Sequence, residues 1–413
     1  HPECEYSFWK AGTETWVTAS ELPASSRALI GFEANPPQEL KRVRGKELEG
    51  LLYRHPFGLR EGKVVPADYV TLEEGTGLVH TAPGFGAEDF ATGKRYGLEV
   101  AAPVDSRGRF AGLPAQVKDL NEMHVQKANP RVIQKLQAAG LLVKEQKIQH
   151  QYPHCWRCRE PIIFRATDQW FLNVEHEDLR ARLLEIVGSQ VRWYPSFGRE
   201  RMAGMLKTRP DWCLSRQRLW GIPIPAVTCG ACGEGILDPR VAENFAAAIE
   251  HDPEGSDQWF TRPVSEWLPE GFACPACKSG KSFQPGADIL DVWFDSGVSH
   301  RGVLRRRKGL THPAEMYLEG SDQHRGWFQV SLITGAALDG KAPFRSVLTH
   351  GFVVDGQGRK MSKSLGNVMA PQEIIAQSGA DVLRLWVASS DYAEDVRLSP
   401  EILAQVSEAY RKI

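Results

Sequence analysis

No part of the sequence is apolar for long enough to cross a membrane. A spanning helix needs about 20 consecutive apolar residues, and the 413-residue chain contains no such run and no charged-then-apolar leader. Basic residues are not in excess either, since 50 lysines and arginines face 51 aspartates and glutamates, for a formal net charge of −1. We therefore expect a cytoplasmic protein with no membrane partner and no uniformly basic coat for nucleic acid, and we expect a monomer.

Cysteine is scarce, but its spacing is informative. Six of the eight cysteines stand in Cys-x-x-Cys pairs, which in a reducing compartment indicate metal binding before disulfides. Two pairs together supply the four thiolates of a closed tetrahedral zinc site, and the alternative is buried or disulfide-linked pairs. A third pair has no second knuckle in this chain, although His154 is a candidate extra ligand. The predicted zinc ligands are Cys229, Cys232, Cys274 and Cys277, with Cys155 and Cys158 as the third pair.

Internal repeats and low-complexity tracts are absent as well, so the chain is expected to fold into roughly two to four globular domains. Up to about residue 145, short apolar strips such as 63–67 and 76–80 alternate with glycine and proline turns. This pattern predicts a β-rich domain that ends in an amphipathic segment near 132–142. Further on, helices are predicted at 177–187, 197–208 and 323–338, and strands at 316–318 and 346–349. That alternation is typical of a parallel α/β sheet.

A glycine-bearing lysine loop carries the most specific chemistry. Lys360 and Lys363 lie three residues apart and follow a hairpin at 353–358 that contains two glycines. Lysine binds phosphate as a compact charge on a flexible stem, and glycines allow turns that wrap backbone amides around an anion. A lysine-rich loop is more often only a solvated surface, so nucleotide chemistry is a leading hypothesis at this point.

Acidic and amide side chains follow the strand predicted at 316–318. Residues 319–323, Glu-Gly-Ser-Asp-Gln, would turn into a helix at the carboxyl end of that strand, where α/β sheets bind ligands. Gly320 permits close approach of the backbone, and the acids could hold an amino group or ribose hydroxyls. The alternative is a capped helix with surface acids.

These blocks resemble the class I aminoacyl-tRNA synthetases, and the isoleucyl enzyme in particular. Lys-Met-Ser-Lys-Ser at 360–364 is similar to the signature loop of that family, and 75–84 is similar to its inserted proofreading domain. The order of the blocks is also that of the family. The other matching blocks are 214–221, 291–297, 317–327, 348–352 and 379–386.

The resemblance implies an α/β chain that holds the second half of a Rossmann-like catalytic fold, a β-rich editing insertion and a zinc-ribbon-like insertion. The family's His-x-Gly-His sequence is missing and the first methionine is Met123. We therefore expect an internal fragment, incomplete for synthesis, with the partner of the third cysteine pair upstream. The implied segments are 1–146 (partial editing domain), 147–225 (return segment into the catalytic domain), 226–285 (zinc-binding insertion), 286–350 (catalytic domain), 351–396 (signature loop and stem contact) and 397–413 (start of a helical anticodon-binding domain).

The implied activity is ATP-dependent attachment of isoleucine to tRNA(Ile) through an aminoacyl-adenylate, with Mg²⁺ accompanying ATP and with hydrolytic editing of valyl-tRNA. Lys360 and Lys363 would stabilise the departing pyrophosphate. The implied ATP contacts are Lys360, Ser362, Lys363, His350 and Gly351. The implied adenylate contacts are Glu319, Gly320, Asp322 and Gln323, with Trp220 and Trp293 as walls of the isoleucine pocket, and the implied editing residues are His80 and Asp89.

Several alternatives remain open from the sequence. The two tryptophans could be ordinary core, His80 a structural histidine and Asp89 a surface acid. Phe85 replaces a histidine that is common in the editing block, and the threonines expected upstream of that block are missing. A valyl- or leucyl-type synthetase, a stand-alone deacylase and a zinc-bearing RNA-binding module are the competing functions. The cations considered for RNA contact are Arg199, Arg201, Lys207, Arg209, Arg216 and Arg218.

Overall fold

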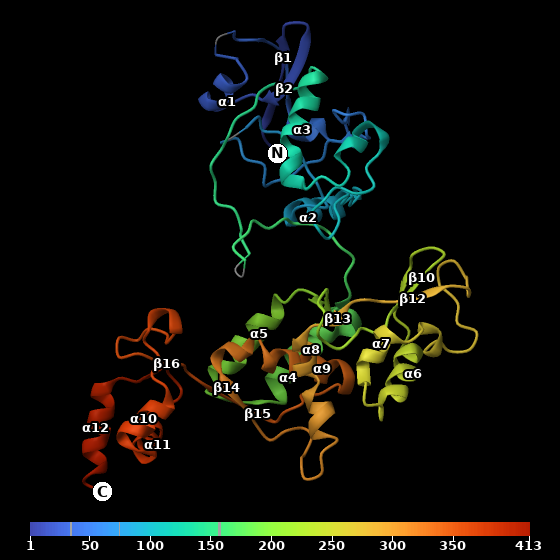
Figure 1. The fold of residues 1–413 in the computed structure, drawn as a ribbon. Helices are drawn as coiled ribbons and strands as arrows, with labels where there is room; N and C mark the ends of the chain where they lie inside the picture. The colour runs from blue at the N-terminus through green and yellow to red at the C-terminus, as the bar shows by residue number, and fades with distance from the viewer. Residues whose placement is uncertain (34, 74, 156–157) are drawn as a thin grey trace. The chain divides into compact units, whose positions relative to one another are not determined.

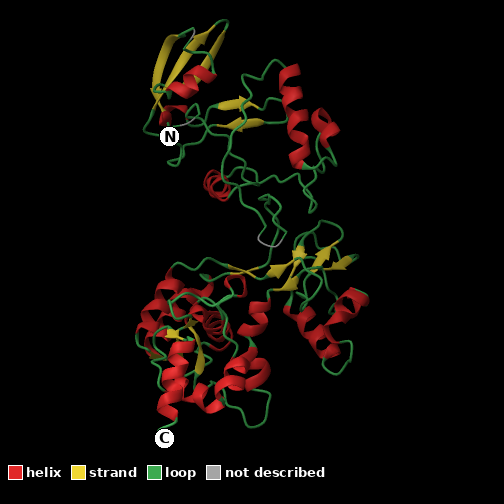
Figure 2. Ribbon diagram, turned by 60° about the vertical axis from the view of Figure 1, so that its left-hand side comes forward, coloured by secondary structure: helices red, strands yellow, loops and turns green. Residues whose placement is uncertain are grey.

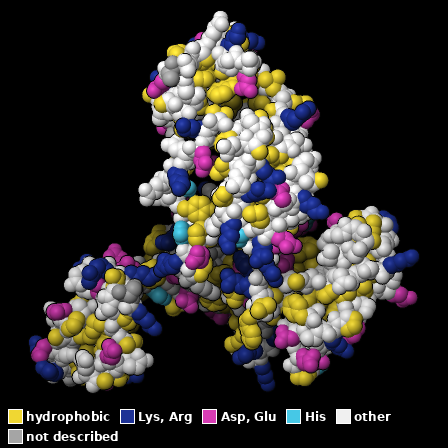
Figure 3. Space-filling view, turned by 45° about the horizontal axis from the view of Figure 1, so that its top comes forward, with side chains coloured by type: hydrophobic (Ala, Val, Ile, Leu, Met, Phe, Trp, Pro, Cys, Tyr) yellow, Lys and Arg dark blue, Asp and Glu magenta, His cyan; other side chains and the backbone are white. Residues whose placement is uncertain are grey.

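The computed structural model describes residues 1–33, 35–73, 75–155 and 158–413. These residues form two compact units, His1–Asp168 and Gln169–Ile413 (Figure 1). Within the described ranges, no helix combines the length and apolar character that a membrane span requires. Acidic and basic side chains are interspersed over the face drawn in Figure 3, as the balanced charge predicts. The finer segment bounds given above stay predictions.

The first unit contains a three-stranded antiparallel sheet in the order β2-β1-β3 (Figure 2). Tyr6 and Val43 from this sheet form a small core with Leu48, because alternate strand residues point to the same face. A hairpin and three α-helices complete the unit. The strands are β1 (Glu5–Ala11), β2 (Glu14–Ala19), β3 (Gln38–Arg44), β4 (Leu52–Arg54) and β5 (Glu61–Lys63), and the helices are α1 (Ala24–Leu29), α2 (Ala87–Tyr96) and α3 (Val125–Ala138).

The two apolar strips noted in this part of the sequence are not regular strands. Only Lys63 of the strip 63–67 lies in a strand, because Pro66 has no amide hydrogen to donate to a ladder. The strip 76–80 is irregular, since Gly75 and Gly77 adopt left-handed φ values of 69° and 75°. It is tied to the sheet instead by the Tyr6 hydroxyl, which donates to the Gly77 carbonyl at 2.8 Å.

The amphipathic helix also lies earlier than predicted. The helix α3 begins at Val125, after His124 accepts a hydrogen bond from the Gln126 amide at 3.4 Å. It ends at Ala138, and Gly140 follows with a φ of 69°. The amphipathic spacing around 132–142 therefore covers only the second half of the helix and the turn that follows it.

The second unit is built on a parallel sheet in the order β14-β15-β7. The predicted alternation from 316 to 349 is confirmed as β14, α9 and β15, and the two helices predicted near 177–208 are confirmed as α4 and α5. Residues 328–336 of α9 are all buried, because this helix carries no charge before Asp339. The elements are α4 (Leu179–Ser189), β7 (Arg192–Tyr194), α5 (Phe197–Lys207), β14 (Tyr317–Gly320), α9 (Trp327–Asp339) and β15 (Ser346–His350).

Smaller groups of elements belong to the same unit. One is a cysteine-bearing sheet, β11-β10-β12, with a core around Trp259 and Phe245. The last residues form three helices and a two-stranded parallel pair around Trp386. The elements are β6 (Phe171–Leu172), β8 (Trp212–Cys213), β9 (Ser215–Arg216), β10 (Val227–Cys229), β11 (Gly235–Ile236), α6 (Pro239–Ile249), α7 (Gln258–Thr261), β12 (Phe283–Pro285), β13 (Ile289–Leu290), α8 (Val292–Gly297), β16 (Val353–Val354), α10 (Pro371–Ser378), α11 (Ala380–Ala388), β17 (Val396–Arg397) and α12 (Pro400–Tyr410).

Candidate active site

The carboxyl ends of β14 and β15 meet at Gly320 and His350. These residues are direct partners in the parallel register. A Cβ at Gly320 would lie 2.9 Å from Asp322 Oδ1 and 3.8 Å from the Phe352 ring, so a side chain at this position would displace the Asp322 carboxylate, whereas glycine leaves it in place. Glu319 and Asp322 beside it are exposed. The edge thus offers close backbone and two accessible carboxylates at the place where α/β sheets bind ligands.

Gln323 organises the entry into α9. Its side-chain oxygen accepts the Trp327 amide at 2.8 Å, and its nitrogen lies 3.4 Å from Asp322 Oδ2. The Trp293 ring approaches from α8, so that a Cβ at Gly326 would lie 3.0 Å from that ring. Gln323 and Trp293 are therefore brought together over Gly326. The glycine itself is the sequence signal for this contact, and sequence reasoning missed it.

A buried histidine forms a hydrogen bond within the same turn. His324 is fully buried and stacks on Trp193 with ring centroids 6.1 Å apart. Burial lowers the pKa of His324, so the neutral ring can donate from Nδ1 to the Ser321 carbonyl at 3.2 Å. This contact fixes the 3₁₀ turn Ser321–His324, which carries two of the predicted adenylate contacts.

Asp291 joins two of the motif blocks. This buried carboxylate caps α8 by accepting the Trp293 amide at 3.2 Å. It also accepts from Trp212 Nε1 at 3.0 Å and from the Arg216 guanidinium at 2.8 Å. The position of Trp293 therefore depends on the block at 214–221. Trp220, from that block, is 94% exposed, so its role as a wall of the isoleucine pocket remains a prediction.

Two of the arginines considered for RNA contact make contacts with the core. The Arg216 guanidinium is paired with Asp291, and Arg209 donates to the Gln329 side chain and lies over the Trp212 ring. These two guanidinium groups therefore contact core residues, and the suggestion that the six cations contact RNA stays a prediction. Arg199 pairs with its neighbour Glu200.

The lysine loop reaches the strand end through an aromatic ring. The Lys360 ammonium lies over the Phe352 ring, 5.6 Å from its centroid, and the edge of the same ring lies 3.8 Å from the point that a Cβ of Gly320 would occupy. His350, Phe352 and Lys360 are thus gathered at one end of the sheet. Gly351 packs against the backbone of Glu394 so closely that a side chain would not fit.

A polar network closes the loop around the two lysines. The Asn367 side chain accepts the Ser362 amide at 2.9 Å and donates to the Lys360 carbonyl at 3.3 Å. It also donates to Asp355 at 3.0 Å. Asp355 is buried, and the Asn367 and Arg359 hydrogen bonds lower its pKa to about 2. This charged carboxylate is the anchor of the loop.

Lys363 stands free of that network. It opens the 3₁₀ turn Lys363–Leu365, which Ser362 caps by accepting the Leu365 amide at 3.3 Å. Lys363 is exposed, as is Lys360. The loop therefore presents two ammonium groups to solvent from a backbone that Asp355 and Asn367 hold, and the roles assigned to both lysines remain predictions.

Four of the five cysteines of the second unit have the geometry of a metal site. Cys229 Sγ lies 3.7 Å from Cys277 Sγ, and Cys232 Sγ lies 3.6 Å from Cys274 Sγ. A tetrahedral zinc with bonds of about 2.3 Å would set its sulfurs about 3.8 Å apart. The amides of Ala231 and Cys232 lower the pKa of Cys229 to about 7, which favours the thiolate that zinc requires. The donor set fits zinc.

The third cysteine pair shares the backbone turn of the other two. In each pair the first cysteine donates its amide to the carbonyl five residues on, and its own carbonyl accepts the amide four residues on. Trp156 and Arg157 lie outside the described residues, and His154 Nδ1 lies 2.5 Å from the Arg159 carbonyl. In all three pairs, the residue four positions after the first cysteine has a positive φ. These residues are Gly233, Lys278 and Arg159, with φ values of 79°, 61° and 66°.

A second group of possible metal ligands was not predicted. His300, His312 and Asp339 have ligand atoms within 4.8 Å of one another. Burial, the neighbouring His312 and nearby arginines lower the pKa of His300 to about 4. Arg305 pairs with Asp339 at 2.6 Å, so cations already surround the group and disfavour a metal ion there. Its histidines are far apart in the sequence, which is why spacing gave no signal.

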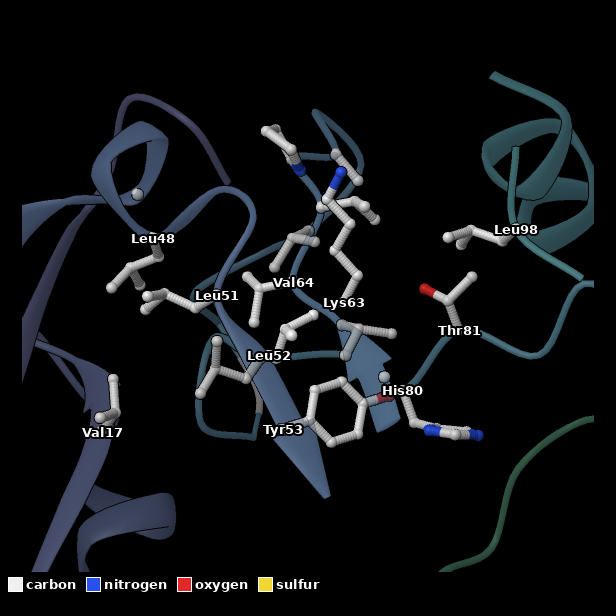
Figure 4. A pocket seen from close by; sticks show the side chains of 18 of the residues that line it. Val17, Leu48, Leu51, Leu52, Tyr53, Lys63, Val64, His80, Thr81 and Leu98 are labelled. Atoms are coloured by element: carbon white, nitrogen blue, oxygen red, sulfur yellow. The ribbon is translucent and has the colours of Figure 1, made fainter. Parts of the chain in front are cut away.

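The first unit contains a largely apolar cavity of about 760 Å³. Leu48, Leu51 and Leu52 lie along one side, and His80 and Thr81 come from the other (Figure 4). The predicted editing histidine thus lines a cavity of ligand size. Thr81 was missed, although it lies inside the resembling block. The cavity is also lined by Tyr53, Lys63, Val64 and Leu98.

Asp89 is close in the chain to this cavity but does not line it. Its carboxylate accepts the Ala82 amide at 3.1 Å, at the start of α2. The residue therefore fixes the segment that carries His80 and Thr81. The predicted grip of Asp89 on a substrate ammonium is untested by this geometry.

Comparisons with known proteins place these features in a family. The model of class I tRNA synthetases (I, L, M and V) matches residues 13–399. Isoleucine–tRNA ligase from Desulfovibrio desulfuricans is 51% identical over 413 residues, which is 100% of this chain and 43% of that protein. The ligase of the same name from Thermotoga maritima is 48% identical over 415 residues, or 100% of this chain and 44% of that protein.

A solved ternary complex of Agrobacterium radiobacter K84 agnB2 LeuRS with tRNA and LeuAMS covers 49% of this chain and 28% of its own, at 26% identity and a TM-score of 0.35. The chain spans less than half the length of the curated relatives that it matches. Because the family match runs from residue 13 to residue 399, the chain belongs to the class I tRNA synthetases of the I, L, M and V group.

Proposed function

We propose that this chain is part of an isoleucine–tRNA ligase, which joins isoleucine to tRNA(Ile) with ATP. The observation that carries the proposal is the 51% identity over the whole chain to a ligase of that name. The geometry agrees with it, since Lys360 and the strand end at Gly320 share the Phe352 ring. A stand-alone deacylase would not need that lysine loop.

The first step would be formation of the adenylate. A carboxylate oxygen of isoleucine attacks the α-phosphorus of ATP, the bond to the β-phosphate oxygen breaks, and pyrophosphate leaves. Lys360 and Lys363 stabilise the negative charge that builds on the leaving oxygens, which is the main catalytic need of phosphoryl-group chemistry. Glu319 and Asp322 offer carboxylates for the substrate ammonium or the ribose hydroxyls. Mg²⁺ accompanies ATP as part of the substrate.

The second step would transfer the amino acid. A terminal hydroxyl of the tRNA attacks the adenylate carbonyl carbon, and AMP leaves. Gln323 and Trp293, which meet over Gly326, would hold the isoleucyl part in place. Trp220 is exposed and would complete the pocket only if its loop moved onto the substrate.

Two zinc sites belong to the proposal. Cys229, Cys232, Cys274 and Cys277 would hold one ion, whose role is to fix the β11-β10-β12 sheet and not to react. Cys155 and Cys158 would provide half of a second site, which is supported by the turn that they share with the first two pairs. Both sites need cysteines kept reduced, as in the cytoplasm.

We further propose that the cavity of the first unit hydrolyses valyl-tRNA. A pocket that accepts isoleucine rejects valine weakly, because one methylene is worth only about 1 to 3 kcal/mol, a limit that is well known for isoleucyl enzymes. A second, hydrolytic sieve would correct the error. His80 and Thr81 in the cavity wall are the polar groups available to orient the ester or a water.

The test is ATP–pyrophosphate exchange by the full-length protein with isoleucine, valine, leucine and methionine. The proposal predicts the highest kcat/KM for isoleucine and a lower value for valine by a factor of about 10 to 200. A preference for valine, leucine or methionine would reassign the enzyme within its family.

A further inference from the structure

The most concentrated positive charge in the described chain lies away from the candidate active site. Five cations occupy eight residues at the end of a short helix, His300–Leu304, and in the turn beyond it. All five are exposed. We call this surface the basic ridge, and its residues are Arg301, Arg305, Arg306, Arg307 and Lys308.

Part of the ridge is hollowed. Arg301, Arg305 and Arg306 line a hollow of about 450 Å³, with Val298 and Gly302 at its floor. An arginine-lined concavity favours an anion over an apolar ligand, because each guanidinium presents several donors in one plane.

The acidic partners of the ridge neutralise only part of it. Arg305 pairs with Asp339 at 2.6 Å, and Arg306 pairs with Glu250 at 3.5 Å. Across the described residues, Arg301, Arg307 and Lys308 form no ion pair. Three exposed charges without an ion pair therefore remain within eight residues of a protein whose formal net charge is −1. The average composition does not explain this local excess of positive charge.

The ridge also lies at the opposite end of α9 from the candidate active site. Asp339, which holds Arg305, closes α9, whereas Trp327 and Gln323 stand at its start. A helix of 13 residues is about 20 Å long at 1.5 Å per residue. A ligand on the ridge therefore does not share the adenylate site.

We propose that the basic ridge binds the phosphodiester backbone of tRNA at a distance from the chemistry; this inference rests on the proposed function for the identity of the RNA. Successive cations along a turn match the successive charges of a sugar–phosphate backbone, and such contacts orient an RNA without reading its bases. Arg209 and Arg216 of the sequence-derived set contact core residues, whereas all five cations of the ridge are exposed.

The experiment uses the full-length protein with Arg301→Gln, Arg307→Gln and Lys308→Gln combined. These residues have no internal ion pair, so the fold and Tm should be unchanged. The matched control removes three dispersed exposed charges, by Lys10→Gln, Lys46→Gln and Lys281→Gln. The readouts are filter binding of tRNA(Ile) across a salt series, KM for tRNA in aminoacylation, and pyrophosphate exchange without tRNA.

The ridge variant should raise the Kd and KM for tRNA about tenfold or more, and it should lower the slope of log K against log salt by about two to three, since each lost phosphate contact removes close to one unit. Pyrophosphate exchange should stay at the wild-type rate, and the control should resemble wild type. The proposal is contradicted if the ridge variant has the wild-type slope of log K against log salt, or if the control variant loses as much tRNA affinity as the ridge variant. An acidic protein would then be the partner to consider for this surface.

Failure of the proposed function would look different from failure of the ridge. If the wild-type protein shows no pyrophosphate exchange with isoleucine, the ligase assignment is wrong. The salt series of tRNA binding still tests the ridge in that case, because it does not depend on catalysis.

Discussion

Lys363 is the residue whose removal should have the largest effect on the proposed chemistry. Loss of one preorganised charge-stabilising donor costs about 2.7 to 4 kcal/mol in the transition state. Lys363→Ala in the full-length protein should therefore slow pyrophosphate exchange with isoleucine by about 10² to 10³, with little change in Tm because the side chain is exposed. Lys281→Ala is the control, and a Lys363→Ala rate within about threefold of wild type would remove the lysine from the mechanism.

Asn367 should act on the same step without touching substrate. Its amide joins Ser362, Lys360 and Asp355, so Asn367→Ala should loosen the backbone that carries both lysines. We expect faster tryptic cleavage after Lys360 and Lys363 and a lower kcat, with an unchanged KM for isoleucine. Cleavage at the wild-type rate would show that the network does not order the loop.

The lowered pKa of Asp355 predicts that the stability of the folded protein depends on pH. Its folded pKa is lowered to about 2, below the value near 3.9 of an unfolded aspartate. The stabilisation that comes from its charge is therefore complete above about pH 4 and is lost as the pH falls from 4 toward 2. The Tm difference between wild type and Asp355→Asn should shrink over that range. A constant difference would mean that the carboxylate is not the charged anchor of the loop.

Individual residues show which features of the candidate site could be predicted from the sequence and which could not. Lys360, Gly320 and the cysteines were found because their chemistry is tied to spacing along the chain. The position of Phe352 near Gly320 and beneath the Lys360 ammonium could not be predicted, since a strand end and a loop 32 to 40 residues away meet only after folding. Trp220 shows the opposite case, because a motif can be present while its side chain stands in solvent.

At the scale of elements, the cysteine-bearing sheet should depend on its metal. The short strands of β11-β10-β12 hold few residues, and a structural zinc supplies folding free energy directly. Chelation should release close to one zinc per four-cysteine site and increase solvent quenching of Trp259, which is fully buried. Cys277→Ser should lose the same metal. Zinc-free protein with unchanged tryptophan burial would contradict a structural role.

Elements were predictable where periodicity was long and uninterrupted. The helices α4, α5 and α9 lie close to their predicted ranges, because several turns of apolar spacing define one buried face. Short strips were less reliable. The residues at 76–80 have a strand-like composition, but two glycines with positive φ turn the backbone and a tyrosine hydroxyl takes the Gly77 carbonyl.

At the scale of the molecule, the editing proposal assigns a separate activity to the first unit. Asp89 fixes the Ala82 amide, so Asp89→Ala should disturb the segment with His80 and Thr81 and slow hydrolysis of valyl-tRNA by about tenfold or more. Pyrophosphate exchange with isoleucine should be unaffected. The measurement is deacylation of valyl-tRNA by the full-length protein, and equal rates for wild type and Asp89→Ala would exclude this residue from editing.

The division of the chain into two units was only partly accessible to sequence reasoning. The change in residue pattern near residue 145 predicted a domain boundary, and the structure divides the chain at residue 168. The intervening residues are largely irregular, so no periodic pattern locates the end of one unit within them. The composition of the chain could not show the basic ridge, because its local charge disappears in a balanced total.

The proposed function requires ATP to bind between the lysine loop and the carboxyl ends of β14 and β15. A crystal structure of the full-length protein with isoleucine and a non-hydrolysable ATP analogue tests this directly. We predict phosphate oxygens within about 4 Å of the Lys360 and Lys363 ammonium groups, with the amino acid beside Gln323 and Trp293 and the ribose near Gly320. A nucleotide bound elsewhere, with both lysines in solvent and the strand ends empty, would contradict the account.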